Sequence, residues 1–164
     1  MEGNLHISYQ FFENERLLVQ KFSGLFSFEL YSKYTNYLMS NIELDSVSKV
    51  IIDFRALTIG KNLKELKQEI KRIAELRRTI QQKTIKKTNV LQLFLVDKPI
   101  PTAVAKIFVN YFPQLDYHIC STLHSAIVHL NLNITENKLE HMIENLTNEF
   151  IATLFEDTNL QNTP

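Results

Sequence analysis

The chain has 164 residues, of which 45% are hydrophobic and 22% charged, and its formal net charge is zero. That length suits one ordinary domain, which buries roughly two thirds of its unfolded surface and needs no disulfide or metal to fold. The single cysteine, Cys120, excludes an intramolecular disulfide, and the glycines at 3, 24 and 60 are too far apart for a phosphate-binding loop. Without a secretory signal pattern or a run of roughly 18 apolar residues, we expect a cytoplasmic protein with no membrane span.

The first part of the chain predicts a hairpin, a helix and a buried strand. Two runs, residues 7–13 and 16–22, flank a short polar turn, as in a β-hairpin. Gly24 is expected to end the second run, and Ser27 to cap a helix that extends to about residue 40. That helix has an apolar face made of Phe28, Tyr31, Tyr34, Tyr37 and Leu38. Residues 47–54 contain consecutive β-branched residues, which is typical of a strand buried on both faces.

The second part alternates helices and strands. Residues 62–82 have the apolar spacing of a long helix, and residues 90–96 form another strand buried on both sides. Pro101 is expected to open a helix that Pro113 ends, and Thr122 to cap a brief helix after a short strand at residues 115–120. A last amphipathic helix is predicted over residues 135–154. Its apolar face holds Leu139, Ile143, Leu146, Phe150 and Leu154.

This order predicts an α/β domain with a mostly parallel five-stranded sheet, an N-terminal β-hairpin and flanking helices. Strands that alternate with helices favour parallel pairing through right-handed crossovers. We expect residues 1–132 to form this domain and residues 133–156 to add a C-terminal amphipathic helix. The polar residues 157–164 are predicted to be a frayed tail.

Short motifs mark the ends of the predicted elements. They are Ser23-Gly24, Asp53-Phe54-Arg55, Val96-Asp97 with Pro99, Thr102-Ala103 and Ala105, and Ser121-Thr122-Leu123 with Ala126 and Leu130. Over residues 5–131 this punctuation resembles the STAS family, which has the anti-sigma-factor antagonist (SpoIIAA-like) fold. The resemblance implies an STAS-like regulatory module of the stand-alone branch. Switch members of that family carry a phosphorylated serine after the third strand, whereas residues 55–60 here hold one hydroxyl, that of Thr58.

Charge is concentrated in particular segments. Residues 61–87 hold ten basic residues and three acids, and the rest of the chain holds 8 basic and 15 acidic residues. No aromatic residue interrupts the basic segment, so base stacking is absent and nucleic acid is not the expected partner. The segment is a solvated helix face or a docking surface for an acidic protein segment, and contact with nucleic acid or anionic lipid is the remaining alternative. The candidate contact residues are Lys64, Lys71, Arg72, Arg77 and Arg78.

A candidate crevice is expected at the carboxyl ends of two buried strands, where open α/β sheets bind ligands. It is outlined by Asp53, Arg55, Thr58, Asp97, Lys98 and Thr102. Two carboxylates are able to perform acid–base chemistry, but carboxylates at strand ends commonly accept hydrogen bonds from the turn backbone. No nucleophile or histidine has a predicted place beside them. We therefore assign no catalytic residues and do not expect an enzyme.

Histidine and cysteine also cluster near the end of the predicted domain. His118, Cys120, His124 and His129 have the spacing H-x-C-x3-H-x4-H, which invites a zinc interpretation. However, His124 and His129 lie about 140° apart around a helix, so the four side chains do not easily converge. We expect a buried cysteine with surface histidines, and neither a metal nor another cofactor.

The sequence favours a non-catalytic regulatory or protein-interaction module. Its protein partner is unidentified, and the docking surface is either the basic helix 61–87 or the strand-end crevice. Because the apolar stripe of the last helix must be buried, on its own sheet or against a second copy, we expect a homodimer through that helix. The alternative function is a carrier of a small apolar ligand or lipid, with the aromatic first helix lining a cavity, although core packing is the commoner use of such a stripe.

Overall fold

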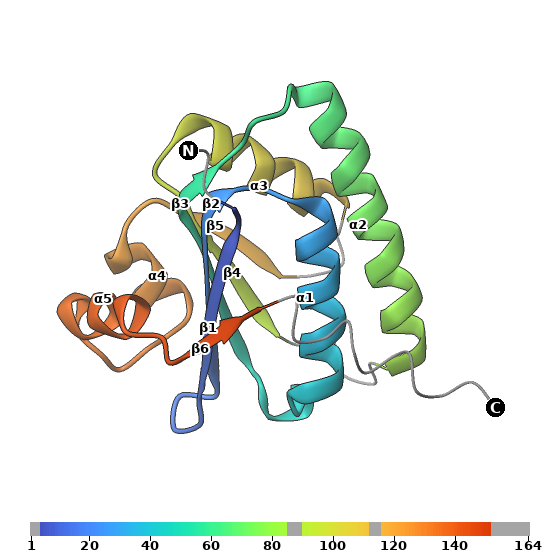
Figure 1. Cartoon of the computed structure of the whole chain (residues 1–164). Helices are drawn as coiled ribbons and strands as arrows, with labels where there is room; N and C mark the ends of the chain where they lie inside the picture. The colour runs from blue at the N-terminus through green and yellow to red at the C-terminus, as the bar shows by residue number, and fades with distance from the viewer. Residues whose placement is uncertain (1–3, 85–89, 112–115, 152–164) are drawn as a thin grey trace.

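The protein has an α/β fold built on a mixed six-stranded sheet with the order β5-β4-β3-β2-β1-β6 (Figure 1). The computed structural model describes residues 4–84, 90–111 and 116–151, except for the side chains of residues 44, 63, 76, 77 and 79–84. The strands are β1 (His6–Phe12), β2 (Leu17–Leu25), β3 (Lys49–Thr58), β4 (Leu91–Leu95), β5 (Tyr117–Cys120) and β6 (Asn148–Phe150). Strands β2 to β5 are parallel neighbours, and β1 is antiparallel to both β2 and β6.

Helices cover both faces of the sheet, with α1, α2 and α3 on one side and α4 and α5 on the other (Figure 1). They are α1 (Phe28–Asn41), α2 (Leu63–Thr84), α3 (Pro99–Tyr111), α4 (Leu123–His129) and α5 (Glu136–Glu144), with a short 3-10 turn η1 (Leu44–Ser46). The hydroxyls of Ser27, Thr122 and Thr135 accept backbone N–H bonds from the third residue beyond each, at 3.3, 3.1 and 3.2 Å. These N-caps are the helix starts expected from the sequence.

The core has two layers because the central strands are buried on both faces. On β3, Ile52 faces the layer under α1, α2 and α3, and Ile51 faces the layer under α4 and α5. The first layer is rich in aromatic rings: Phe22 lies 5.3 Å from Phe54 and 5.7 Å from Tyr34 between ring centroids. The prediction of doubly buried strands and an α/β fold is confirmed.

The predicted C-terminal helix over residues 135–154 is wrong beyond Glu144. The helix ends at Asn145, whose side-chain amide donates to the His141 carbonyl oxygen at 2.8 Å, and the chain returns as β6. That strand pairs with β1 and raises the number of strands from five to six. Phe150 then lies on the α1 side of the sheet, 5.4 Å from the ring of Tyr34, instead of sharing a face with Leu139. Leu154 lies outside the described residues.

The apolar side of α5 is buried within the chain. Leu139 is 0% and Ile143 is 1% exposed, and both pack against the second face of the sheet. The sequence left two ways to bury this apolar stripe, on the sheet of the same chain or against a second copy. The structure shows the stripe buried on the sheet of the same chain. A homodimer through this helix stays a prediction. Because the apolar side of α5 is buried, such a dimer would have to use the exposed polar side of the helix.

Strand β3 is longer than predicted, and so is β2. Gly24 adopts φ 83°, a conformation that glycine takes without strain, and β2 continues past it to Leu25. A register shift between Lys21 and Ser23 precedes this extension, and β3 follows it in parallel to Thr58. The additional pairing keeps the backbone after residue 54 in the sheet, so the strand ends at Thr58 and not at residue 54 as predicted.

Candidate functional site

The exposed side of α2 carries most of the candidate partner-binding residues. Leu66, Ile70 and Ile73 face the sheet and are at most 2% exposed. The opposite side presents five exposed cationic residues, namely Lys64, Lys67, Lys71, Arg72 and Arg78. The side chain of Arg77, the remaining candidate, lies outside the described residues. The amphipathic pattern of this helix therefore placed the other four candidates on the surface.

The acidic residues of α2 offset only part of this charge. Glu69 is mostly buried and forms an ion pair with Lys61, whereas Glu65 and Glu75 are exposed. The described surface of α2 thus holds five cations and two carboxylates between residues 64 and 78, over about 21 Å of helix. A rigid, net positive surface of this length, which we call the basic face of α2, suits an extended acidic segment.

The chain does not cover the basic face with its own acidic helix. Helix α5, which carries Glu136, Glu140 and Glu144, lies on the other side of the sheet from α2 (Figure 1). One cation has a structural contact, since the Arg78 guanidinium donates to the Tyr111 carbonyl oxygen at 3.2 Å and ties α2 to the end of α3. The sheet therefore separates the basic and acidic segments of the sequence.

The predicted strand-end crevice is only partly formed. Asp97, Lys98 and Thr102 line a pocket of about 480 Å³ at the carboxyl end of β4, together with Lys106 and Ser121. The Thr102 hydroxyl donates to the Lys98 carbonyl oxygen at 2.7 Å, within the first turn of α3. This pocket holds two ammonium groups and one carboxylate, a combination that favours an anionic ligand group.

The prediction that Asp53, Arg55 and Thr58 belong to the same crevice is wrong. Asp53 and Arg55 lie inside β3 and point toward α5, because the longer β2–β3 pairing continues past them. Thr58 is exposed at the end of β3, where its carbonyl oxygen accepts the Phe26 N–H at 2.8 Å. None of the three lines the pocket around Asp97.

Asp53 and Arg55 instead form a buried ion pair. The Asp53 side chain is 2% exposed, and its two carboxylate oxygens accept from Arg55 Nε at 3.1 Å and Nη2 at 2.9 Å. Arg55 Nη1 donates to both carboxylate oxygens of Glu140, at 3.2 and 3.1 Å, and so joins β3 to α5. The hydrogen bonds that Arg55 donates to the Asp53 carboxylate raise the pKa of Arg55 further above its usual value. Asp53, one of the two carboxylates considered for acid–base chemistry, is therefore the partner of Arg55 in a buried ion pair.

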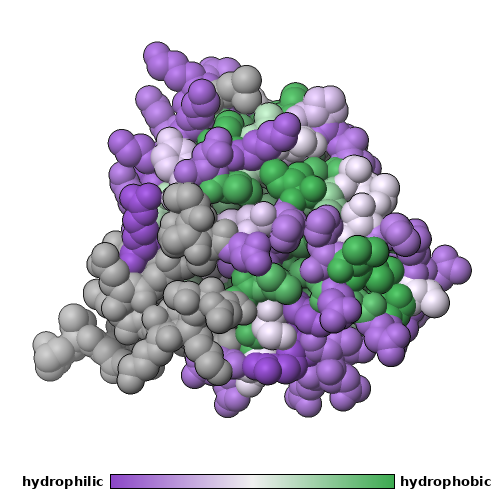
Figure 2. Space-filling model, turned by 180° about the vertical axis from the view of Figure 1, so that it is seen from behind, coloured by the Kyte–Doolittle hydropathy of each residue, from purple (hydrophilic) through white to green (hydrophobic). Residues whose placement is uncertain are grey.

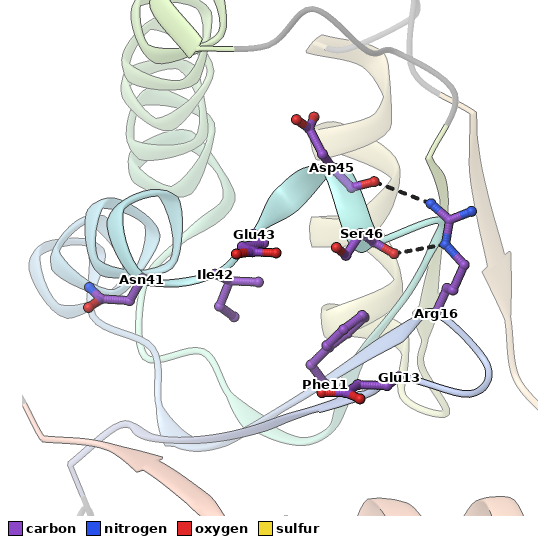
Figure 3. Close-up of a pocket in the computed structure, with 8 residues that line it drawn as sticks. All are labelled: Phe11, Glu13, Arg16, Asn41, Ile42, Glu43, Asp45 and Ser46. Carbon is purple, nitrogen blue, oxygen red and sulfur yellow. Dashed lines mark hydrogen bonds between the residues drawn. The ribbon is translucent and has the colours of Figure 1, made fainter.

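A further pocket was not foreseen from the sequence. It has a volume of about 610 Å³ and lies at the amino end of β3, between the β1–β2 turn, the end of α1 and η1. Figure 3 shows Arg16 reaching toward η1, where it donates to the carbonyl oxygens of Ser46 at 3.0 Å and Asp45 at 3.2 Å. Glu13 and Glu43 also line this pocket. The sequence showed only that Glu13 and Glu43 are acidic. It could not predict the pocket, because the lining residues come from segments that are distant in the sequence.

The histidine and cysteine cluster does not converge. The His118 ring stacks on that of His129 with centroids 4.5 Å apart, and His124 Nδ1 lies 3.3 Å from a Glu136 carboxylate oxygen. Cys120 is 5% exposed, and burial raises the pKa of its thiol. Among the residues described, no three His, Cys, Asp or Glu side chains gather in a way that could hold a metal ion.

The aromatic face of α1 packs into the core. Tyr31 and Tyr34 both contact Phe22, with centroids 5.8 and 5.7 Å apart, so rings occupy the space between α1 and the sheet. The hydroxyls of Tyr9 and Tyr37 are 2.7 Å apart, and burial, reinforced by this hydrogen bond, raises the pKa of Tyr9. A hollow of about 640 Å³ instead lies at the start of α1. Its lining includes Leu5, Leu25, Phe26, Leu30, Phe150 and Ile151.

No family model matches the chain, and the search of curated proteins found no match. Within residues 4–84, 90–111 and 116–151, every helix is too short or too polar to cross a membrane.

Proposed function

We propose that the protein is a non-catalytic regulatory or protein-interaction module of the STAS-like type, whose basic face of α2 docks an acidic segment of a protein partner. The single observation that carries this proposal is the charge on the exposed side of α2. Among the described side chains of this helix, five cations and two carboxylates are exposed, while the apolar side is buried. Such a surface attracts acidic segments over a distance of about 8 Å at physiological salt, and it orients them along the helix.

The fold and the site both support this assignment. An N-terminal hairpin followed by a mostly parallel α/β sheet is the arrangement that the family resemblance implies. The contacts of the two strand-end carboxylates support a role other than catalysis. Asp53 forms an ion pair with Arg55, and Asp97 lies in an open pocket with two lysines. A binding role requires neither a cofactor nor a nucleophile.

The test uses a short fluorescein-labelled oligoglutamate peptide as the acidic probe and fluorescence anisotropy as the measurement. The triple variant K64E/K67E/K71E reverses the charge of three exposed side chains. Three surface ion pairs at about 0.5 kcal/mol each correspond to about tenfold in Kd, and the added repulsion increases the loss. We expect the triple variant to bind the peptide at least tenfold more weakly. We also expect the affinity of the unmodified chain for the peptide to fall as the salt concentration is raised.

Two matched variants separate this surface from the alternatives. K64R/K67R/K71R keeps the charge and should bind as the unmodified chain does. K98E/K106E reverses the lysines of the strand-end pocket, and loss of binding there but not in the α2 triple variant would move the docking site to that pocket. Equal binding by all variants would refute docking on α2, and preference for a duplex DNA probe over the peptide would replace an acidic protein with nucleic acid.

A carrier of a small apolar ligand is the second candidate. The observation that favours it is the hollow at the start of α1, where half of the lining residues are apolar, among them Leu25, Leu30 and Ile151. Native mass spectrometry of freshly purified protein tests this function. Extra mass that disappears on denaturation would support a carrier, and a chain that carries no extra mass would remove it.

A further inference from the structure

Strand β5 is one edge of the sheet formed by the described strands. Among the described strands it pairs only with β4. The Gln92 N–H donates to the Asp116 carbonyl oxygen and the Val96 N–H to that of Cys120, both at 2.9 Å. Because alternate residues of a strand direct their backbone groups to opposite sides, the N–H and C=O of Ile119 point away from β4.

This edge is short, but it lacks the other features that usually prevent association. Strand β5 has the sequence Tyr-His-Ile-Cys, without a lysine, a proline or a register shift. The opposite edge is different, since β6 has three residues, of which Asn148 and Glu149 are exposed. A polar, short edge resists pairing, whereas an apolar regular edge favours it.

Partly exposed apolar side chains flank β5 on both faces of the sheet. Ile107 and Ile119 are half-buried on the α3 side. On the α4 side Ile127 is half-buried, and Val128 is 62% exposed. Figure 2 shows the molecule from behind, where apolar side chains gather in the upper middle and at the right. These flanks add the apolar area that a short strand pair needs for stable association.

We propose that two copies of the chain associate through β5, antiparallel about a two-fold axis, with Ile119 opposite the partner's Ile119. Each Ile119 N–H then donates to the carbonyl oxygen of the other, and one continuous sheet runs through both copies. The two-fold axis uses the same edge on both copies, so the assembly closes as a dimer and does not grow into a filament.

Charge favours a second copy as the occupant. The side chain of Asp116, at the start of β5, is 60% exposed, and one of its carboxylate oxygens lies 3.2 Å from His118 Nε2. Ser121 follows the other end of the strand and lines the pocket that contains Lys98 and Lys106. Antiparallel pairing places the acidic start of one strand beside the basic end of the other, at both ends of the interface. This surface is separate from the basic face of α2, and the inference does not depend on the proposed function.

The first test is the solution mass of the full chain, measured by light scattering at about 100 μM because association depends on concentration. We expect twice the chain mass. V128K should raise the dimer dissociation constant at least tenfold without unfolding the chain, because Val128 is mostly exposed. The matched control is I151K, at an exposed apolar residue beyond β6 on the opposite edge, which should leave the dimer intact. A monomeric full chain, or equal effects of the two variants, would overturn the proposal.

The second test measures the register. With Ile119 at the two-fold axis, His118 lies opposite the partner's Cys120 in a pair whose β-carbons are about 4.5–5.5 Å apart. Prolonged oxidation of H118C should therefore give a disulfide-linked dimer, slowly because the Cys120 thiol is buried, and H118C/C120S should not form one. E149C, at an exposed residue of β6, is the control and should stay monomeric on a denaturing gel. Cross-linking by E149C and not by H118C would place the interface on the other edge and refute this one.

Discussion

Removal of the Arg55 guanidinium is the sharpest test of the ion pair that joins β3 to α5. The variant R55M keeps the unbranched apolar stem of the side chain, but it leaves the Asp53 carboxylate without its charged partner. Asp53 is 1% exposed, so water cannot replace the guanidinium without opening the structure. The carboxylate retains one hydrogen bond from the backbone N–H of residue 55, at 3.0 Å.

The magnitude follows from this burial. Removing one partner of a buried ion pair destabilises proteins by about 3–5 kcal/mol. The Arg55 side chain is 24% exposed and the backbone hydrogen bond persists, so we expect the lower end, about 3 kcal/mol. For a chain of this size that loss corresponds to a Tm lower by about 6–12 °C. E140Q should lose about 1 kcal/mol or less, because the Glu140 side chain is 33% exposed.

Urea unfolding followed by circular dichroism measures these free energies of unfolding. The double variant R55M/D53N is the decisive comparison, because it removes the buried charge that R55M leaves without a partner. We expect it to recover about half of the R55M loss, with a coupling energy in the usual range of about 0.5–3 kcal/mol. A loss below about 1 kcal/mol for R55M, or no recovery in the double variant, would show that the ion pair is not structural.

Three further predictions concern the core. F150A should lower the free energy of unfolding by about 3 kcal/mol in urea unfolding, because Phe150 is 6% exposed and packs on the rings of Tyr34 and Tyr37; a loss below about 1 kcal/mol would contradict the position of β6. The pKa of Tyr9 is higher in the folded than in the unfolded chain, so stability should be constant below pH of about 10 and fall above it, and Y9F should reduce that fall. Urea unfolding at several alkaline pH values measures this, and an identical pH dependence in Y9F would exclude the effect. Burial raises the pKa of Cys120, so its thiol should react slowly with Ellman's reagent at pH about 8 and rapidly in urea. Rapid reaction without urea would contradict the burial of this thiol.

Features that depend on neighbouring residues were predictable from the sequence. Each N-cap at Ser27, Thr122 and Thr135 involves a side chain and a backbone group three residues away, so local chemistry determines it. The spacing in α2 likewise determines which side chains face the sheet, and it placed Lys64 and Lys71 on the surface before any contact was known. The alternation of strands and helices predicted the α/β fold for the same reason.

The strand-end crevice and the last helix required the tertiary structure. The length of β3 is set by its pairing with β2 past Gly24, which moves Asp53 and Arg55 into the strand. Leu139 and Phe150 have helical spacing in the sequence, but pairing of β6 with β1 places them on opposite faces of the sheet. Likewise, Arg55 meets Glu140 across 85 residues. Periodicity reports which residues share a face of one element, but only long-range backbone pairing decides where that element ends and against which surface it packs.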